Sequence, residues 1–167
     1  MAQWSLKERL QPSLLDRLTD DAPGNKKESS SQQVLSQKQF KDAVIRDLAW
    51  LVNTTSLETI LDFSAAPEVK KSVINYGMPD ISGHTSNSVD IASLEKSLQR
   101  IIYDFEPRII HNSLKVRVHS NPDEMNHNSL IFSIEGVVFG QPMPFQVVLR
   151  SELDLECGQF VVREDTS

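Results

Sequence analysis

Cysteine and long hydrophobic runs are what this chain lacks most clearly. The single cysteine among 167 residues, Cys157, rules out an internal disulfide and fits a reducing compartment. No apolar run approaches the roughly 20 residues that a membrane-spanning helix needs. The first residues, MAQWSLKERLQPSLLDRL, mix charges of both signs with apolar side chains and contain no signal-peptide pattern. We therefore expect a cytoplasmic protein that inserts into no membrane.

Positive charge is also in short supply. The chain carries 17 basic and 23 acidic side chains, so its formal net charge is -6. Nucleic-acid affinity rests largely on Lys and Arg side chains that displace counterions from phosphates. The charge balance therefore argues against a nucleic-acid partner.

Motifs for catalysis and for cofactor or metal binding are missing as well. No P-loop, GxGxxG, HExxH or GxSxG pattern occurs. Cys157 has no local base to activate it, so we expect no nucleophile there. The histidines have no compact ligand spacing, and we expect no metal or cofactor; they are His84, His111, His119 and His127.

A paired-carboxylate site is the remaining catalytic alternative. Asp104 and Glu106 have the residue types of a glycosidase pair, but such enzymes hold two carboxyls across a sugar-binding cleft. Neither of the two tryptophans, Trp4 and Trp50, is close to the pair in the sequence. We therefore favour a structural or interface role and expect no enzyme.

The chain divides by composition into an arm, a linker and one domain. Residues 1–20 end in a short amphipathic stretch containing Leu14, Leu15 and Leu18. Residues 21–37 are rich in Ser, Gln and Lys, which is typical of a flexible linker. Residues 38–167 have the length of a single domain. The leucines of the arm are expected to dock either on this domain or on a partner.

Two amphipathic helices open the domain. The segment 38–55 carries a broad apolar stripe that includes Phe40, Leu48 and Leu51. Trp50 lies off that stripe, near Arg46, so it either meets a second layer, forms an interface or is covered by a loop or the arm. The segment 90–106 has a narrower stripe, with Asp90 or Ser93 as N-cap, and Pro107 ends it.

The period then changes from helical to alternating, which indicates strands. The segments 114–118, 130–139, 145–156 and 160–162 alternate apolar and polar residues, and Gly136 suggests a bulge in the second. We predict an α+β fold: two main helices on one face of a small antiparallel sheet of three to four strands, with an N-terminal arm. A free edge of such a sheet can accept a strand from another chain.

The run YDFEPRII joins the second helix to the first strand. Pro107 stiffens the backbone, so Glu106 and Arg108 are expected to project to similar sides as a two-charge fork. The fork is either an internal ion pair or a contact with a partner, and its chemistry allows both.

Four ordered motifs resemble one known family. They are PSLLDRLTDD, RDLAWLVNT, VINYGMPDISG and FEPR, and strands follow them. In this order they resemble TssE, the small baseplate subunit of bacterial type VI secretion systems, whose family includes the lysozyme-named wedge proteins of contractile phage tails. The resemblance covers nearly all of the chain except the linker.

The resemblance implies a role in assembly. It implies the wedge proteins TssF, TssG and TssK and the sheath proteins TssB and TssC as partners, with the sheet edge as a template for sheath strands. It assigns Glu106, Pro107 and Arg108 as the sheath or wedge contact, and we add Trp50, Arg46 and the arm leucines. The alternatives are a cytosolic regulatory binder resembling anti-adaptor proteins, which share this fold, and a lysozyme-like hydrolase.

Overall fold

A computed structural model describes residues 13–19, 24, 35–81, 90–120, 129–139 and 144–164. The expected linker lies mostly outside these residues, as do His84 and His127. The proposed division into arm, linker and domain therefore stays a prediction.

Three helices form where the apolar stripes predict them. They are α1 (Leu14–Leu18), α2 (Gln37–Val52) and α3 (Ile91–Phe105). At the start of α2, Ser36 and Gln39 cap each other's backbone N–H groups, which satisfies donors that a helix N-terminus leaves free. Asp90 is the N-cap of α3, and α3 ends at Phe105, just before the residue that Pro107 disfavours in a helix.

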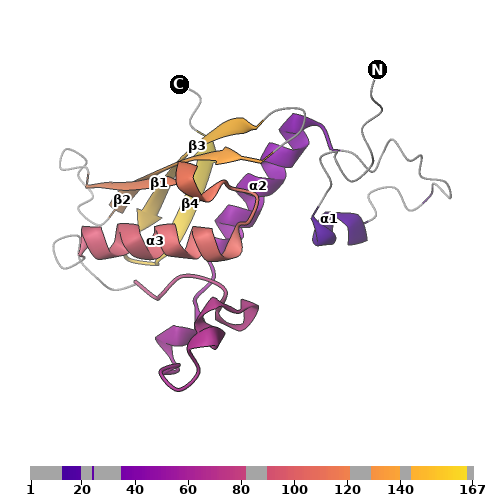
Figure 1. The fold of residues 1–167 in the computed structure, drawn as a ribbon. Coiled ribbons are helices and arrows are strands. Elements are labelled where there is room, and N and C mark those ends of the chain that lie inside the picture. Colours follow the sequence, from indigo (N-terminus) through magenta and orange to yellow (C-terminus); the bar gives the residue numbers. More distant parts are fainter. Residues whose placement is uncertain are drawn as a thin grey trace.

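The strands form one antiparallel sheet in the order β1-β2-β3-β4. They are β1 (Lys115–Ser120), β2 (Ser129–Val138), β3 (Phe145–Asp154) and β4 (Gln159–Glu164). Figure 1 shows α3 running below the sheet and α2 crossing it at one end. The predicted α+β class is confirmed.

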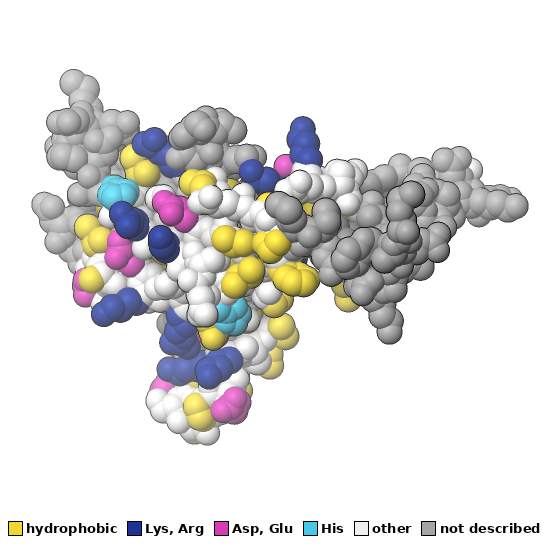
Figure 2. All heavy atoms as spheres, turned by 45° about the horizontal axis from the view of Figure 1, so that its top comes forward, with side chains coloured by type: hydrophobic (Ala, Val, Ile, Leu, Met, Phe, Trp, Pro, Cys, Tyr) yellow, Lys and Arg dark blue, Asp and Glu magenta, His cyan; other side chains and the backbone are white. Residues whose placement is uncertain are grey.

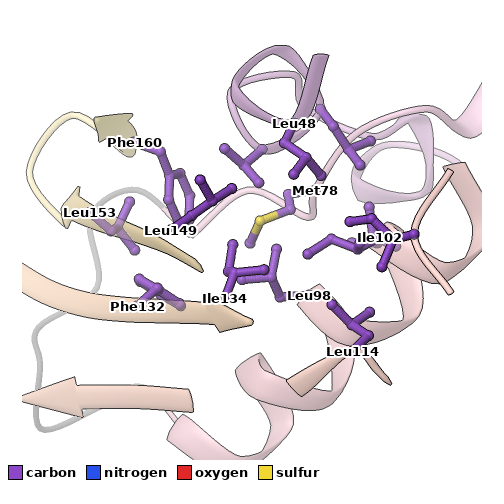
Figure 3. Close-up of a cluster of buried hydrophobic side chains, with 14 of the residues drawn as sticks. Leu48, Met78, Leu98, Ile102, Leu114, Phe132, Ile134, Leu149, Leu153 and Phe160 are labelled. Atoms are coloured by element: carbon purple, nitrogen blue, oxygen red, sulfur yellow. The ribbon is translucent and has the colours of Figure 1, made fainter. Parts of the chain in front are cut away.

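The core lies between the sheet and the two long helices. Figure 3 shows Leu48 of α2 and Leu98 of α3 approaching Phe132, Leu149 and Phe160 of the strands. Leu98, Phe132 and Leu149 are fully buried. The expected alternation is confirmed, since every second residue of β2 is buried. The opposite face of the sheet is left without a covering helix among the described residues.

The predicted bulge at Gly136 is wrong. β2 pairs with β3 without interruption from Ser129 to Val138, and Gly136 stands opposite Val147. A Cβ atom at Gly136 would lie 3.0 Å from Cγ2 of Ile109. The glycine is therefore explained by the close approach of the chain segment that precedes β1, not by an extra residue in the strand.

The segment between α2 and α3 folds into short 3-10 turns and extends away from the sheet (Figure 1). The turns are η2 (Leu57–Thr59), η3 (Pro67–Lys71) and η4 (Val73–Asn75). Gly77, which follows these turns, has φ +121°. A Cβ atom there would lie 2.2 Å from the carbonyl oxygen of Thr54. The motif VINYGMPDISG therefore requires glycine at this position for a physical reason.

Candidate functional site

A chain of ion pairs joins residues that lie far apart in the sequence. We call it the charged cluster, and its members are Asp16, Arg46, Asp47, Glu106 and Arg108. The cluster links the arm helix α1, the middle of α2 and the turn after α3. It is the point where the sequence motifs meet.

Glu106 and Arg108 form a two-pronged pair within the chain. Nε of Arg108 donates to Oε1 of Glu106 at 2.6 Å, and Nη2 donates to Oε2 at 2.5 Å. The backbone N–H of Arg108 also donates to Oε1, at 3.2 Å. Only 4% of Glu106 is exposed, so its carboxylate faces the interior. Burial opposes the charge on Arg108, but hydrogen bonds and the charges of Glu106 and Asp47 outweigh it and raise the pKa of Arg108.

Asp47 extends the pair to the surface of α2. Its Oδ2 accepts from Nη2 of Arg108 at 2.7 Å, and its Oδ1 accepts from Arg46. Arg46 in turn donates to Asp16 of α1. The hydrogen bond from Arg46 lowers the pKa of Asp16 and outweighs the effect of partial burial, while the bond to Asp16 raises the pKa of Arg46. A polar contact thus attaches helix α1 to helix α2.

Aromatic residues pack beside the charged cluster. The hydroxyl of Tyr76 donates to the backbone oxygen of Asp47 at 3.4 Å, and its ring meets Phe105 edge to face at 5.4 Å. Burial raises the pKa of Tyr76, and the nearby Asp47 and Glu106 raise it further. All four motifs that carry the family resemblance therefore contribute to one contact network.

Of the expected partner-binding residues, Glu106 is buried, whereas Pro107, Trp50 and the leucines of α1 are exposed. Pro107 and Trp50 are exposed, and the guanidinium of Arg46 lies 4.9 Å from the centroid of the Trp50 ring. The arm helix buries none of its residues, so Leu14, Leu15 and Leu18 face outward. Of the alternatives for Trp50, a second layer and a covering loop are not seen in the part of the chain that the structure describes. A partner contact at these residues stays a prediction.

Side chains and a neighbouring segment occupy the sheet edge on the β1 side. Oε1 of Glu95 accepts from the N–H of Val118 at 2.7 Å, and Nε2 of Gln99 donates to the oxygen of Leu114. Ile109, which precedes β1 in the sequence, forms a β-bridge with Val138 of β2. The fork thus leads directly into a short backbone pairing with the end of β2, next to the start of β1.

The β4 edge is capped at one position. Asn53, the residue after α2, accepts from the N–H of Phe160 at 2.8 Å and donates to its oxygen at 3.0 Å. Outward-facing backbone groups recur at every second residue of an edge strand, so those of Val162 follow on the same side. Among the described residues, no protein group accepts a hydrogen bond from the outward N–H of Val162.

Sequence reasoning missed the residues that cap the two edges. Glu95 and Gln99 lie one turn apart on α3, and their spacing could have indicated a polar stripe toward β1. Asn53 is a usual residue at the end of a helix, and nothing near it in the sequence points to a contact with Phe160, since 107 positions separate them.

The described residues form neither a catalytic pair of carboxylates from Asp104 and Glu106 nor a group of metal ligands. Asp104 pairs with Arg100 at 3.6 Å, whereas Glu106 pairs with Arg108. Among the residues that the structure covers, no three His, Cys, Asp or Glu side chains are grouped as metal ligands. No helix in the described ranges is long and apolar enough to span a bilayer.

Comparison with protein families identifies one match. The family model described as baseplate wedge protein gp25 matches residues 38–143, which include α2 apart from its first residue, α3, the fork, β1 and β2. The chain belongs to this baseplate wedge family. Family membership supports a structural role in a phage tail-like baseplate, in contact with other baseplate components. The match ends before β3. Comparisons with curated proteins and with solved structures give no match.

Proposed function

We propose that this baseplate wedge protein is a non-enzymatic structural subunit of a bacterial type VI secretion system. It joins the baseplate wedge to the contractile sheath and helps to start sheath polymerisation. It acts in the cytoplasm, at the cytoplasmic side of the inner membrane. Family membership supports the baseplate part of this proposal, and the four ordered motifs that resemble TssE support the secretion system.

The observation that carries the sheath role is the difference between the sheet edges. On the β1 side, Glu95, Gln99 and the segment at Ile109 occupy backbone groups. On β4, Asn53 occupies the groups of Phe160, and the strand continues past it to Glu164. A strand from a sheath subunit would add beside β4 from Val162 onward, since main-chain hydrogen bonds give such additions their affinity.

The surface around the charged cluster is the proposed contact with the wedge. Arg108 and Arg46 keep 21% and 35% of their side chains exposed, and Pro107 and Trp50 lie outside the core. Exposed Trp and Arg are enriched at the centres of protein interfaces. The internal pair with Glu106 would then hold Arg108 in one orientation for TssF, TssG or TssK. The outward leucines of α1 extend the same surface.

The direct test deletes the gene in the native cell and follows a fluorescent TssB sheath. We expect loss of sheaths, recovery with the wild-type chain, and co-purification of the chain with TssF, TssG and TssK. Sheath assembly that continues at the normal frequency without the chain would contradict the proposal.

The fork is tested in the same cells with Arg108→Ala. If the variant folds and no longer co-purifies with the wedge, the contact is supported. A folded variant that still binds the wedge and assembles sheaths would remove Arg108 from the interface. Lys71→Ala is the control, because Lys71 is an exposed basic residue on η3, away from the cluster.

A further inference from the structure

The segment between α2 and α3 carries apolar surface that the domain does not bury. We call residues 57–80 the lobe, and it stands away from the sheet (Figure 1). Four of its aliphatic side chains are between 50% and 81% exposed, namely Ile60, Leu61, Val73 and Ile74. Figure 2 shows hydrophobic and charged side chains together on the lobe at the bottom of the view. Apolar surface gathered in this way is typical of an interaction site.

A hollow of 580 Å³ opens on the lobe. Ile60, Leu61 and Phe63 form its apolar lining. Its volume lies within the range of about 300 to 1,000 Å³ that binding sites usually have. Two of the exposed aliphatic residues, Val73 and Ile74, do not line it. The lobe therefore offers apolar side chains inside the hollow and, as an internal comparison, others outside it.

Hydrogen bonds from separate parts of the lobe hold the walls of the hollow. Asn75 is buried; its Oδ1 accepts from the N–H of Glu58 at 2.8 Å, and its Nδ2 donates to the oxygen of Lys70 at 3.1 Å. Oγ1 of Thr59 accepts from the N–H of Asp80 at 3.3 Å. The hollow is thus formed before any partner arrives, which lowers the ordering cost of binding.

The charge around the hollow is negative. Three carboxylates, those of Glu58, Asp62 and Asp80, line it together with one ammonium group, that of Lys70. Hydrogen bonds from Ser64 lower the pKa of Asp62, and the charge of Lys70 lowers it further. Among the described residues, the carboxylate of Glu58 forms no ion pair. The lobe carries four acidic and two basic side chains, and the whole chain has a net charge of -6, so the local and the overall field both attract a cation.

We propose that the hollow binds a segment of a partner protein in which one Lys or Arg side chain is flanked by apolar residues. The cation would lie beside the carboxylate of Glu58, where a charge-assisted hydrogen bond can form. The apolar neighbours would cover Leu61 and Phe63 and remove their surface from water. The negative field disfavours an acidic segment, a nucleic acid and an anionic lipid surface. This surface lies apart from the charged cluster and from β4, so it goes beyond the proposed function.

The test titrates the full chain with a short peptide that has one Lys between two Leu residues and Gly at both capped ends. Binding is followed by two-dimensional NMR at about 150 mM salt, where a Debye length of about 8 Å limits attraction by distant charges. We expect the peptide to bind at least fivefold more tightly than the same peptide with Gln in place of Lys or with Ala in place of Leu. The amide signals of Thr59 and Leu61 should shift, whereas that of Val162 should not, which separates this surface from the β4 edge.

Two matched pairs of variants make the result specific. Glu58→Lys should weaken peptide binding at least tenfold, whereas Glu68→Lys, the same charge change on η3 outside the hollow, should alter it less than twofold. Leu61→Ser should weaken binding at least fivefold, whereas Val73→Ser, which removes a more exposed side chain outside the hollow, should alter it less than twofold. Unchanged melting temperatures show that the variants fold. If Glu58→Lys does not fold, Glu58→Gln keeps the size of the side chain and should weaken binding at least threefold.

Several outcomes would overturn the proposal. Equal weakening by Glu58→Lys and Glu68→Lys would mean that the peptide senses net charge alone, and equal weakening by Leu61→Ser and Val73→Ser would mean that the hollow has no special role. Binding to phosphatidylglycerol vesicles, lost on Leu61→Ser, would assign the lobe to a membrane surface. Concentration-dependent dimerisation abolished by Leu61→Ser would assign it to a second copy of this chain. Absence of any peptide-induced shift at Thr59 and Leu61 would refute the site.

Discussion

The two edges of the sheet are protected by different means. On the β1 side, helix α3 supplies Glu95 and Gln99, and the segment after Pro107 pairs with the end of β2. On the β4 side, one amide, Asn53, holds one residue, Phe160. Edge strands that are left unpaired invite pairing with another chain. The comparison teaches that the β1 side is held at several points by α3 and by the segment after Pro107, whereas β4 is held at one; we call the β1 side the closed edge.

The largest expected effect comes from breaking the closed edge at its anchor. Glu106→Gln leaves Arg108 beside a neutral amide, with Asp47 as its remaining charged partner. Removing one member of a buried ion pair costs about 3 to 5 kcal/mol, and we expect about 3 because Asp47 remains. The free energy of unfolding from urea denaturation measures this.

Hydrogen exchange locates that effect. The amide of Phe139 donates to the oxygen of Arg108. Relative to wild type, Glu106→Gln should accelerate the exchange of this amide more than that of the amides of β4. Glu68→Gln, an exposed change on η3, should stay within about 0.5 kcal/mol of wild type. A Glu106→Gln variant as stable as this control would refute the internal role of the pair.

A smaller effect is expected from opening the β4 edge further. Asn53→Ala removes both side-chain hydrogen bonds to Phe160, each worth about 0.5 to 1.5 kcal/mol, so we expect a loss of about 1.5 kcal/mol. Exchange of the Phe160 amide should accelerate. Asn112→Ala, at an exposed site on η5 (His111–Ser113), is the matched control. Unchanged exchange at Phe160 would show that Asn53 does not protect the edge.

Crowding the closed edge should cost less again. In Gly136→Ala, the new Cβ meets Ile109 at 3.0 Å and pushes it away from β2. We expect a loss of about 1 kcal/mol, the lower end of the range for overpacking, because a methyl group can shift. Gly24→Ala provides the comparison, since nothing lies within 4 Å of its Cβ. Equal thermal stability of the two variants would contradict the close approach.

The smallest effect concerns pH and should leave both edges unchanged. The pKa of Asp16 is lowered from 3.8 by Arg46, so its contribution is present above the unfolded value and is lost as the pH falls through the lowered pKa. Acid should therefore release the arm. Because Arg46 lies over Trp50, the NMR signal of the Trp50 indole N–H should shift on acidification. In Asp16→Asn that shift should be absent, and a shift of equal size would disprove the link.

Much of the fold follows from local patterns. The apolar stripe around Leu98, the stop at Pro107 and the alternation through Phe132 were sufficient to place helices and strands in an α+β fold. The function of Gly136 could not be read in the same way, because its constraint comes from Ile109 across space.

The candidate site was harder to predict than the fold. The sequence pointed to Glu106 and Arg108 as a rigid pair but left open whether the pair faces inward or outward. Its partner Asp47 lies 61 positions from Arg108, and Asn53 lies 107 positions from Phe160. Such contacts depend on how the helices pack on the sheet, which no local spacing encodes.

The most direct test of the account places the same substitution on both edges. Val162→Pro removes an outward N–H from β4, and Val116→Pro removes one from β1, between the two positions that α3 caps. Both variants are expressed in cells that lack the chain and carry a fluorescent sheath. The account predicts that both proteins fold and that sheaths are lost with Val162→Pro alone. Normal sheath assembly with folded Val162→Pro would contradict it.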